Sequence, residues 1–106
     1  MSKPIPRELA GRSIDCVFEG FVPRLTFGAD GMRVQADLPN VRIDEVVAAD
    51  VTTLGRDVFA VFWTEANGNF VVQVQDHENG IVHNYARLAD GQLFCGTGTI
   101  RPVVQA

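Results

Sequence analysis

Residues 58–68, VFAVFWTEANG, form an apolar segment that ends in a carboxylate and a turn. Alternate side chains of this segment fall into two apolar sets, Val58, Ala60 and Phe62 against Phe59, Val61 and Trp63. This period of two is typical of a β-strand, and a strand with two apolar faces is either covered on both sides or lines a closed barrel. Glu65 shares the parity of Trp63, so the sequence predicts an acid in an apolar strand.

The rest of the chain also alternates with a period of two, and no window shows a helical stripe. Further strands are predicted at 13–18, 24–27, 32–38, 70–75, 81–88 and 92–100, and residues 41–54 are read as one strand or as two with a bend. Turns are predicted at 28–31, 65–69, 76–80 and 89–91. Seven to eight strands joined by hairpins predict an all-β, antiparallel meander β-barrel, with Gly96 and Gly98 bending the last strand where the barrel closes.

Length and composition predict one domain over residues 1–106, in which residues 1–11 form a short loose arm that holds one helical turn. Thirteen acids outnumber nine bases without any basic cluster, so nucleic acid is not an expected partner. The apolar stretches are too short to cross a membrane, and the N-terminus lacks the apolar core of a signal peptide. We therefore expect a cytoplasmic protein with no membrane partner.

Two cysteines and two histidines offer few ways to hold a metal. Cys16 and Cys95 lack the paired short spacings of a metal site and are expected to be free thiols. His77 lies in a predicted turn and is expected to face solvent, while His83 lies within a strand and either faces water or acts as an acid or base inside the barrel. No metal and no cofactor are predicted.

Glu65 has two readings from the residues alone. It ends its strand and points to solvent beside the turn, or it lies at an apolar cavity, where burial would favour its protonated form and suit it to acid–base chemistry. Arg42 likewise either anchors a substrate anion beside Glu65 or is a solvated arginine paired with Asp44 or Glu45.

The segment resembles the strand and turn of the phenolic acid decarboxylases and of the related MoaF-type domains, which are small calycin-like (lipocalin-like) β-barrels. In the decarboxylases a valine-rich strand also ends in Trp-Thr-Glu before a glycine-containing turn, which corresponds here to Trp63, Thr64, Glu65 and Gly68. The catalytic Glu of that family has a catalytic Arg upstream, and Arg42 stands at the matching separation of 65 − 42 = 23 residues. The resemblance implies that Glu65 and Arg42 form a catalytic pair.

The first strand departs from the decarboxylase pattern. Two tyrosines that hold the substrate carboxylate in that family correspond here to Cys16 and Phe18, and neither side chain hydrogen-bonds a carboxylate as a phenol does. Tyr85, the sole tyrosine, could replace one phenol if it points inward, and it shares parity with His83. In QDHENGIVH, residues 75–83, the chain looks more like a MoaF-type domain.

Two functions follow as expectations, and a third reading is structural. The first is a cofactor-free lyase or isomerase acting on a small aromatic or unsaturated molecule, with Glu65 and Arg42 catalytic and a pocket shaped by Trp63, Phe18, Cys16, Val61, Tyr85 and His83. The alternative is a non-catalytic protein of MoaF-like type that binds a small hydrophobic or aromatic ligand. The third is a module that pairs with a second copy as a homodimer.

Overall fold

The computed structural model describes residues 5–104, which form nine antiparallel strands. The strands are β1 (Ser13–Val17), β2 (Arg24–Phe27), β3 (Met32–Leu38), β4 (Val41–Val47), β5 (Asp50–Gly55), β6 (Val58–Thr64), β7 (Phe70–Asp76), β8 (Ile81–Arg87) and β9 (Leu93–Pro102). The all-β meander is confirmed, with nine strands in place of seven to eight. Within residues 5–104, no helix is long and apolar enough to cross a membrane.

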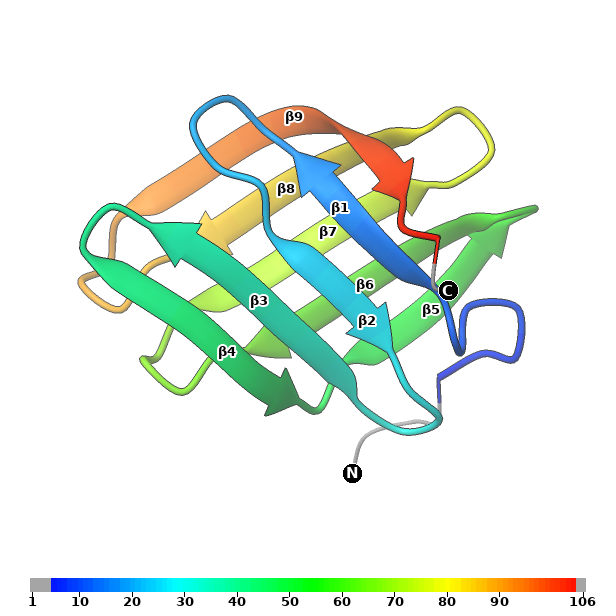
Figure 1. Cartoon of the computed structure of the whole chain (residues 1–106), viewed down its shortest axis with the longest axis horizontal. Helices are drawn as coiled ribbons and strands as arrows, with labels where there is room; N and C mark the ends of the chain where they lie inside the picture. The colour runs from blue at the N-terminus through cyan, green and yellow to red at the C-terminus, as the bar shows by residue number, and fades with distance from the viewer. Residues whose placement is uncertain (1–4, 105–106) are drawn as a thin grey trace.

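All nine strands belong to one sheet, in the order β4-β3-β2-β1-β9-β8-β7-β6-β5. The first and last strands pair through Ile14–Val17 and Thr99–Pro102, so the meander closes on itself there. Figure 1 shows β1–β4 as one layer and β5–β9 as a second layer that crosses it. We call this arrangement the open barrel.

The barrel is open between its two edge strands, β4 and β5, which follow one another along the chain but do not pair. Only Ala48 and Ala49 separate them, and the buried Ala49 lies at the bend that carries the chain from one layer to the other. The predicted barrel is closed by hydrogen bonds between β1 and β9, whereas this bend takes the place of a ladder between β4 and β5. The bend also explains the ninth strand, because it divides the segment predicted at residues 41–54 into two strands, β4 and β5.

The seam between β1 and β9 depends on Gly98. A Cβ atom at this position would collide with the carbonyl oxygen of Val17 and lie 2.8 Å from Cδ1 of Phe18. On the outside of the same seam, Asp15 accepts hydrogen bonds from Arg24 of β2 and Arg101 of β9 at 2.8 and 3.1 Å. The two arginines hold the pKa of Asp15 below its usual value, and the hydrogen bond from Arg24 has the largest effect. Burial of Asp15 acts in the opposite direction.

One end of the open barrel, at the right of Figure 1, is closed by the segment before β1. Leu9 is fully buried there, and the turn around it is held by bonds from the N–H groups of Leu9 and Ala10 to the carbonyl of Pro6. The predicted helical turn is therefore present, but residues 5–10 are not a loose arm. Residues 1–4 of the predicted arm lie outside the described residues.

Strand β6 buries one apolar face and leaves part of the other exposed. Phe59, Val61 and Trp63 point into the open barrel and are almost fully buried. On the outer face Phe62 is 40% exposed, and its ring lies 5.9 Å from that of the equally exposed Phe70. The second apolar face of this strand therefore contributes to an exposed hydrophobic surface and is not covered within the described chain.

Candidate functional site

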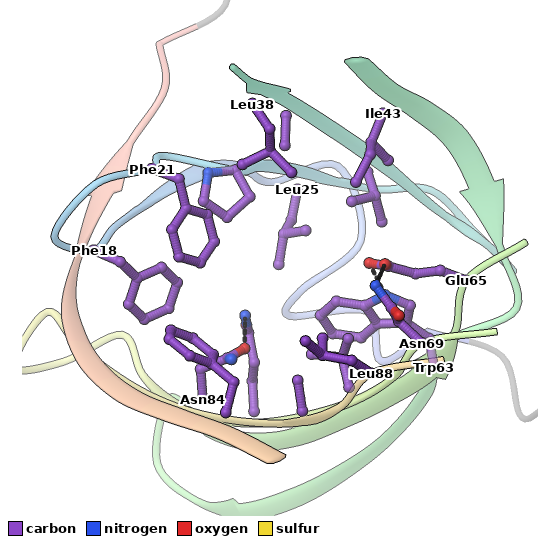
Figure 2. Close-up of a pocket in the computed structure, with 17 residues that line it drawn as sticks. Phe18, Phe21, Leu25, Leu38, Ile43, Trp63, Glu65, Asn69, Asn84 and Leu88 are labelled. Carbon is purple, nitrogen blue, oxygen red and sulfur yellow. Dashed lines mark hydrogen bonds between the residues drawn. The ribbon is translucent and has the colours of Figure 1, made fainter. Parts of the chain in front are cut away.

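A cavity of about 250 Å³ lies between the two layers, at the end of the open barrel where the β3–β4, β6–β7 and β8–β9 turns gather. We call it the mouth cavity. Its wall is mostly apolar and comes from both layers. Figure 2 shows the residues that line it: Phe18, Phe21, Pro23, Leu25, Val34, Ala36, Leu38, Ile43, Trp63, Glu65, Asn69, Val71, Gln73, Asn84, Ala86, Leu88 and Phe94.

Glu65 is the one charged side chain among these lining residues. Glu65 as a whole is only 9% exposed, and Figure 2 shows its carboxylate directed into the cavity. Oε2 accepts a hydrogen bond from Nε1 of Trp63 at 3.2 Å, and Oε1 accepts one from Nδ2 of Asn69 at 3.3 Å. Two donors therefore fix the carboxylate, and no Arg or His of residues 5–104 forms an ion pair with it.

The β6–β7 turn, residues 65–69, places Glu65 and Asn69 together. The N–H of Glu65 donates to the carbonyl of Asn69 at 2.8 Å, and Gly68 takes the positive φ of 95° that lets the chain reverse. Oδ1 of Asn69 accepts from the N–H of Ala89, which ties this turn to the β8–β9 turn. Glu45 on the edge strand β4 accepts from the N–H of Ala66 at 3.0 Å. The turn is thus held from both sides of the mouth before any ligand binds.

A row of buried polar side chains leads from the mouth cavity toward the closed end. Gln73 donates to Oδ1 of Asn84 at 2.9 Å and accepts from Gln75 at 2.8 Å. Oε1 of Gln75 bonds Nε2 of His77 at 2.9 Å, and Arg12 bonds the other ring nitrogen at 3.1 Å. The amides of this row satisfy one another, so Asn84 reaches the cavity already oriented by a partner behind it.

Three of the predicted site residues meet at the mouth cavity, and two more lie beneath it. Glu65, Trp63 and Phe18 line the cavity, whereas Val61 and Cys16 are fully buried in the core. Sγ of Cys16 faces Oε1 of Gln73 at 3.9 Å, and burial above all raises the pKa of the thiol to about 12. A thiol with that pKa stays protonated near neutrality, so Cys16 is not a ready nucleophile.

The structure does not bring the other three predicted residues to the cavity. Arg42 points outward, is 76% exposed and lies 3.6 Å from Asp37, because its position in β4 has the parity of the outer face. His83 and Tyr85 share the outer face of β8, where His83 bonds Thr97 at 3.2 Å. Of the alternatives given for Arg42 and His83, the structure has the solvent-facing one, and Tyr85 does not point inward, so assigning these three residues to the site was wrong. His77, expected in solvent, is half-buried with its ring against Phe59.

Sequence reasoning missed the amides and two phenylalanines of the site. Asn84 could have been found by parity, because it alternates with His83 and Tyr85 and shares its face with the buried Val82. Phe21 lies between β1 and β2, Phe94 lies in β9, and their ring centroids are 6.0 Å apart. No sequence pattern predicts the contact between these two rings, because it depends on the pairing of β1 with β9.

A metal site is not formed by the residues that the structure describes. Over residues 5–104, no three His, Cys, Asp or Glu side chains are grouped closely enough to hold a metal ion. Both cysteines are free, Cys16 buried and Cys95 exposed. The polar groups of the cavity are a carboxylate and three amides, which suit hydrogen bonding to an organic molecule.

Comparison with known proteins relates the chain to one family and one solved fold. The model of the family described as MoaF-like matches residues 10–101. A crystal structure from Burkholderia vietnamiensis, of a protein described as a candidate beta-lactamase, aligns with a TM-score of 0.85 and 22% sequence identity, over 92% of this chain and 97% of the other. That likeness shows a shared fold alone. No curated protein matches the sequence.

Proposed function

The chain belongs to the MoaF-like family, and we propose that it binds a small, largely apolar organic molecule in the mouth cavity. The observation that carries the proposal is a preformed apolar cavity with a few converging polar groups, which is the usual build of a small-molecule site. Its volume of about 250 Å³ lies just under the common range of roughly 300–1,000 Å³, so the ligand is small.

The polar groups of the cavity support binding because they are held in place in advance. Glu65 is fixed by Trp63 and Asn69, and Asn84 is fixed by Gln73. A ligand that meets such groups loses little binding free energy to ordering the protein. Lactamase chemistry through a serine has no support here, because Ser13, the one serine within residues 5–104, bonds Thr26 and lies away from the cavity wall.

The single tryptophan makes this proposal directly testable. Trp63 is the only Trp of the chain and lines the cavity, so its fluorescence reports on occupancy. Titration with a library of small aromatic and aliphatic compounds should give saturable changes for some members. The variant Ala86→Phe places a ring in the cavity and should abolish them, whereas Thr52→Phe adds the same ring on an exposed strand position and should not. Binding that persists in Ala86→Phe, or no saturable change with any compound, would refute the proposal.

A second candidate function is acid–base catalysis by Glu65, favoured by one observation. Its carboxylate borders an apolar cavity and is oriented by two donors, as a group that moves protons on a bound substrate needs to be. Because Arg42 lies outside, this cofactor-free lyase or isomerase would act without the arginine that the decarboxylases use. Glu65→Gln should then retain binding of an uncharged compound found in the titration while turnover of that compound disappears; equal turnover in the variant would exclude catalysis by Glu65.

A further inference from the structure

The charge pattern of the mouth cavity limits the chemistry of its occupant. Glu65 brings a negative charge to the wall, and every other lining residue is apolar or neutral. The net charge of the whole chain is also negative, with a formal value of −4 at pH 7. Because an apolar wall screens charge poorly, an anion placed beside Glu65 would be repelled and a cation attracted far more than in water.

The Glu65 carboxylate keeps hydrogen-bonding capacity toward the cavity. An ionised carboxylate offers about four lone-pair sites, and the bonds from Trp63 and Asn69 use one site on each oxygen. Both protein donors are neutral N–H groups, which hold the carboxylate without cancelling its charge. Since the carboxylate points into the cavity in Figure 2, the remaining lone pairs face the space a ligand would fill.

A cluster of aromatic rings forms the side of the cavity that lies across from Glu65. Phe18 and Phe21 stack with centroids 5.2 Å apart, and Phe94 continues the cluster from β9. The indole of Trp63 lies directly beside the carboxylate that it binds. Ring faces attract cations as well as apolar groups, so the wall accepts both parts of an amphiphilic cation.

We propose that the ligand of the mouth cavity is a small organic cation, an aryl-alkyl or alkyl ammonium whose charged nitrogen donates to Glu65 while its apolar body packs among Phe18, Phe21 and Phe94. This inference rests on the proposed binding function and names the ligand class of that site. It differs from the substrate anion that Arg42 would anchor beside Glu65, one of the two alternatives given for Arg42, because Arg42 lies on the outer surface.

Three compounds of nearly equal shape test the charge preference in the unmodified protein. These are 2-phenylethylammonium, 2-phenylethanol and phenylacetate, titrated at neutral pH and low salt with Trp63 fluorescence as the readout. The ammonium should bind at least tenfold more tightly than the alcohol, and phenylacetate should bind weakest. Tighter binding of the alcohol or of phenylacetate would overturn the inference while leaving the proposed binding function intact.

A matched pair of variants then assigns the preference to Glu65. Glu65→Gln should lower the affinity for the ammonium at least tenfold and leave that for the alcohol nearly unchanged. Glu19→Gln makes the same change in net charge at an exposed position of the β1–β2 turn and should alter neither affinity. Equal losses in both variants would mean that only overall charge matters and would overturn the assignment.

The remaining outcomes distinguish a failure of the cation inference from a failure of the proposed binding function. If Glu65→Gln does not fold, as judged by circular dichroism, the three-compound series in the unmodified protein still decides the charge preference. If none of the three compounds binds but neutral members of the wider library do, the cation inference fails and the binding function stands. If nothing in either set binds, both fail.

Discussion

The two ends of the open barrel are built from the same strands and have opposite interiors. At the closed end, Leu9 of the N-terminal segment and the strand residues Phe27, Met32 and Phe59 are almost fully buried. At the mouth the interior side chains stand apart around a cavity of about 250 Å³ and include an acid with neutral partners. The difference indicates that the closed end carries stability, whereas the mouth is free to carry function.

Polar residues show the same contrast. At the closed end Arg12 bonds Asp57 at 2.9 Å and His77 at 3.1 Å, which joins the N-terminal segment to the β5–β6 and β7–β8 turns. At the mouth Glu65 has neutral donors and faces open space. A charged group that is fully partnered holds structure together, and one that is oriented but not neutralised is available to a ligand.

The largest expected effect comes from truncating the same residue type at each end. Leu9→Ala should lower the free energy of unfolding by about 2–5 kcal/mol, because it leaves a cavity under the N-terminal segment. Leu38→Ala removes a half-buried side chain from the mouth and should cost about 1 kcal/mol or less. Urea unfolding followed by circular dichroism measures both. Equal losses would contradict the division of roles between the ends.

A smaller effect is expected at the seam that bounds the mouth. Gly98→Ala should destabilise the protein by about 1–3 kcal/mol, since its Cβ has no room beside Val17 and Phe18. Gly96→Ala is the matched control two residues earlier, where the added Cβ would lie 3.6 Å from the Phe94 ring in ordinary contact. Thermal unfolding should show no loss for Gly96→Ala. A harmless Gly98→Ala would mean that the end of β1 does not lie so close to its neighbour β9 at this position.

Period-two alternation predicted most of the strands and correctly placed Trp63 and Glu65 on one face of the strand. Of the two readings of Glu65 that it left open, the structure has the one at the cavity. The alternation also predicted the bend within residues 41–54 as one alternative. These features are local, because they depend on side-chain parity and turn residues within a few positions. The resemblance to MoaF-type domains added the family, which the match over residues 10–101 confirms.

The features that the sequence did not predict correctly depend on contacts between strands that are distant along the chain. In β7 the polar Gln73 and Gln75 point inward and the apolar Val72 and Val74 lie on the outer face, the reverse of the usual pattern. The inversion works because partners on β8 and at His77 satisfy the amides, which no local rule shows. Arg42 was placed by its separation from Glu65 alone, and spacing does not determine which face of β4 a side chain occupies.

A still smaller effect is expected from pH at the closed end. Burial, followed by the charge of Arg12, lowers the pKa of His77 from its ordinary 6.5, while Asp57 and Asp76 oppose the shift. Well above pH 6.5, His77 is neutral in both the folded and the unfolded state and contributes no slope. As pH falls below 6.5 the unfolded chain takes up the proton first, so the free energy of unfolding should fall by at most about 1.4 kcal/mol per pH unit.

The variant His77→Gln isolates this contribution because it cannot take up a proton. Urea unfolding at pH 7.5, 6.5 and 5.5 should show a decline in the unmodified protein that is reduced in the variant. Ligand binding at the mouth should stay the same at pH 7.5 in both proteins, since His77 does not line the cavity. An identical decline in both proteins would contradict the assignment to His77.

The smallest effect is expected from replacing Arg42, and finding no effect there would be informative. Arg42 and Asp37 form an outer-surface pair at 3.6 Å with side chains 76% and 85% exposed, and such pairs add little to stability. Arg42→Ala should therefore leave the unfolding temperature, and the Trp63 fluorescence titration with each ligand, unchanged within error. Glu65→Gln in the same titration is the positive control. A selective loss of anionic ligands in Arg42→Ala would restore the arginine to the site and would mean that the mouth rearranges on binding to bring β4 inward.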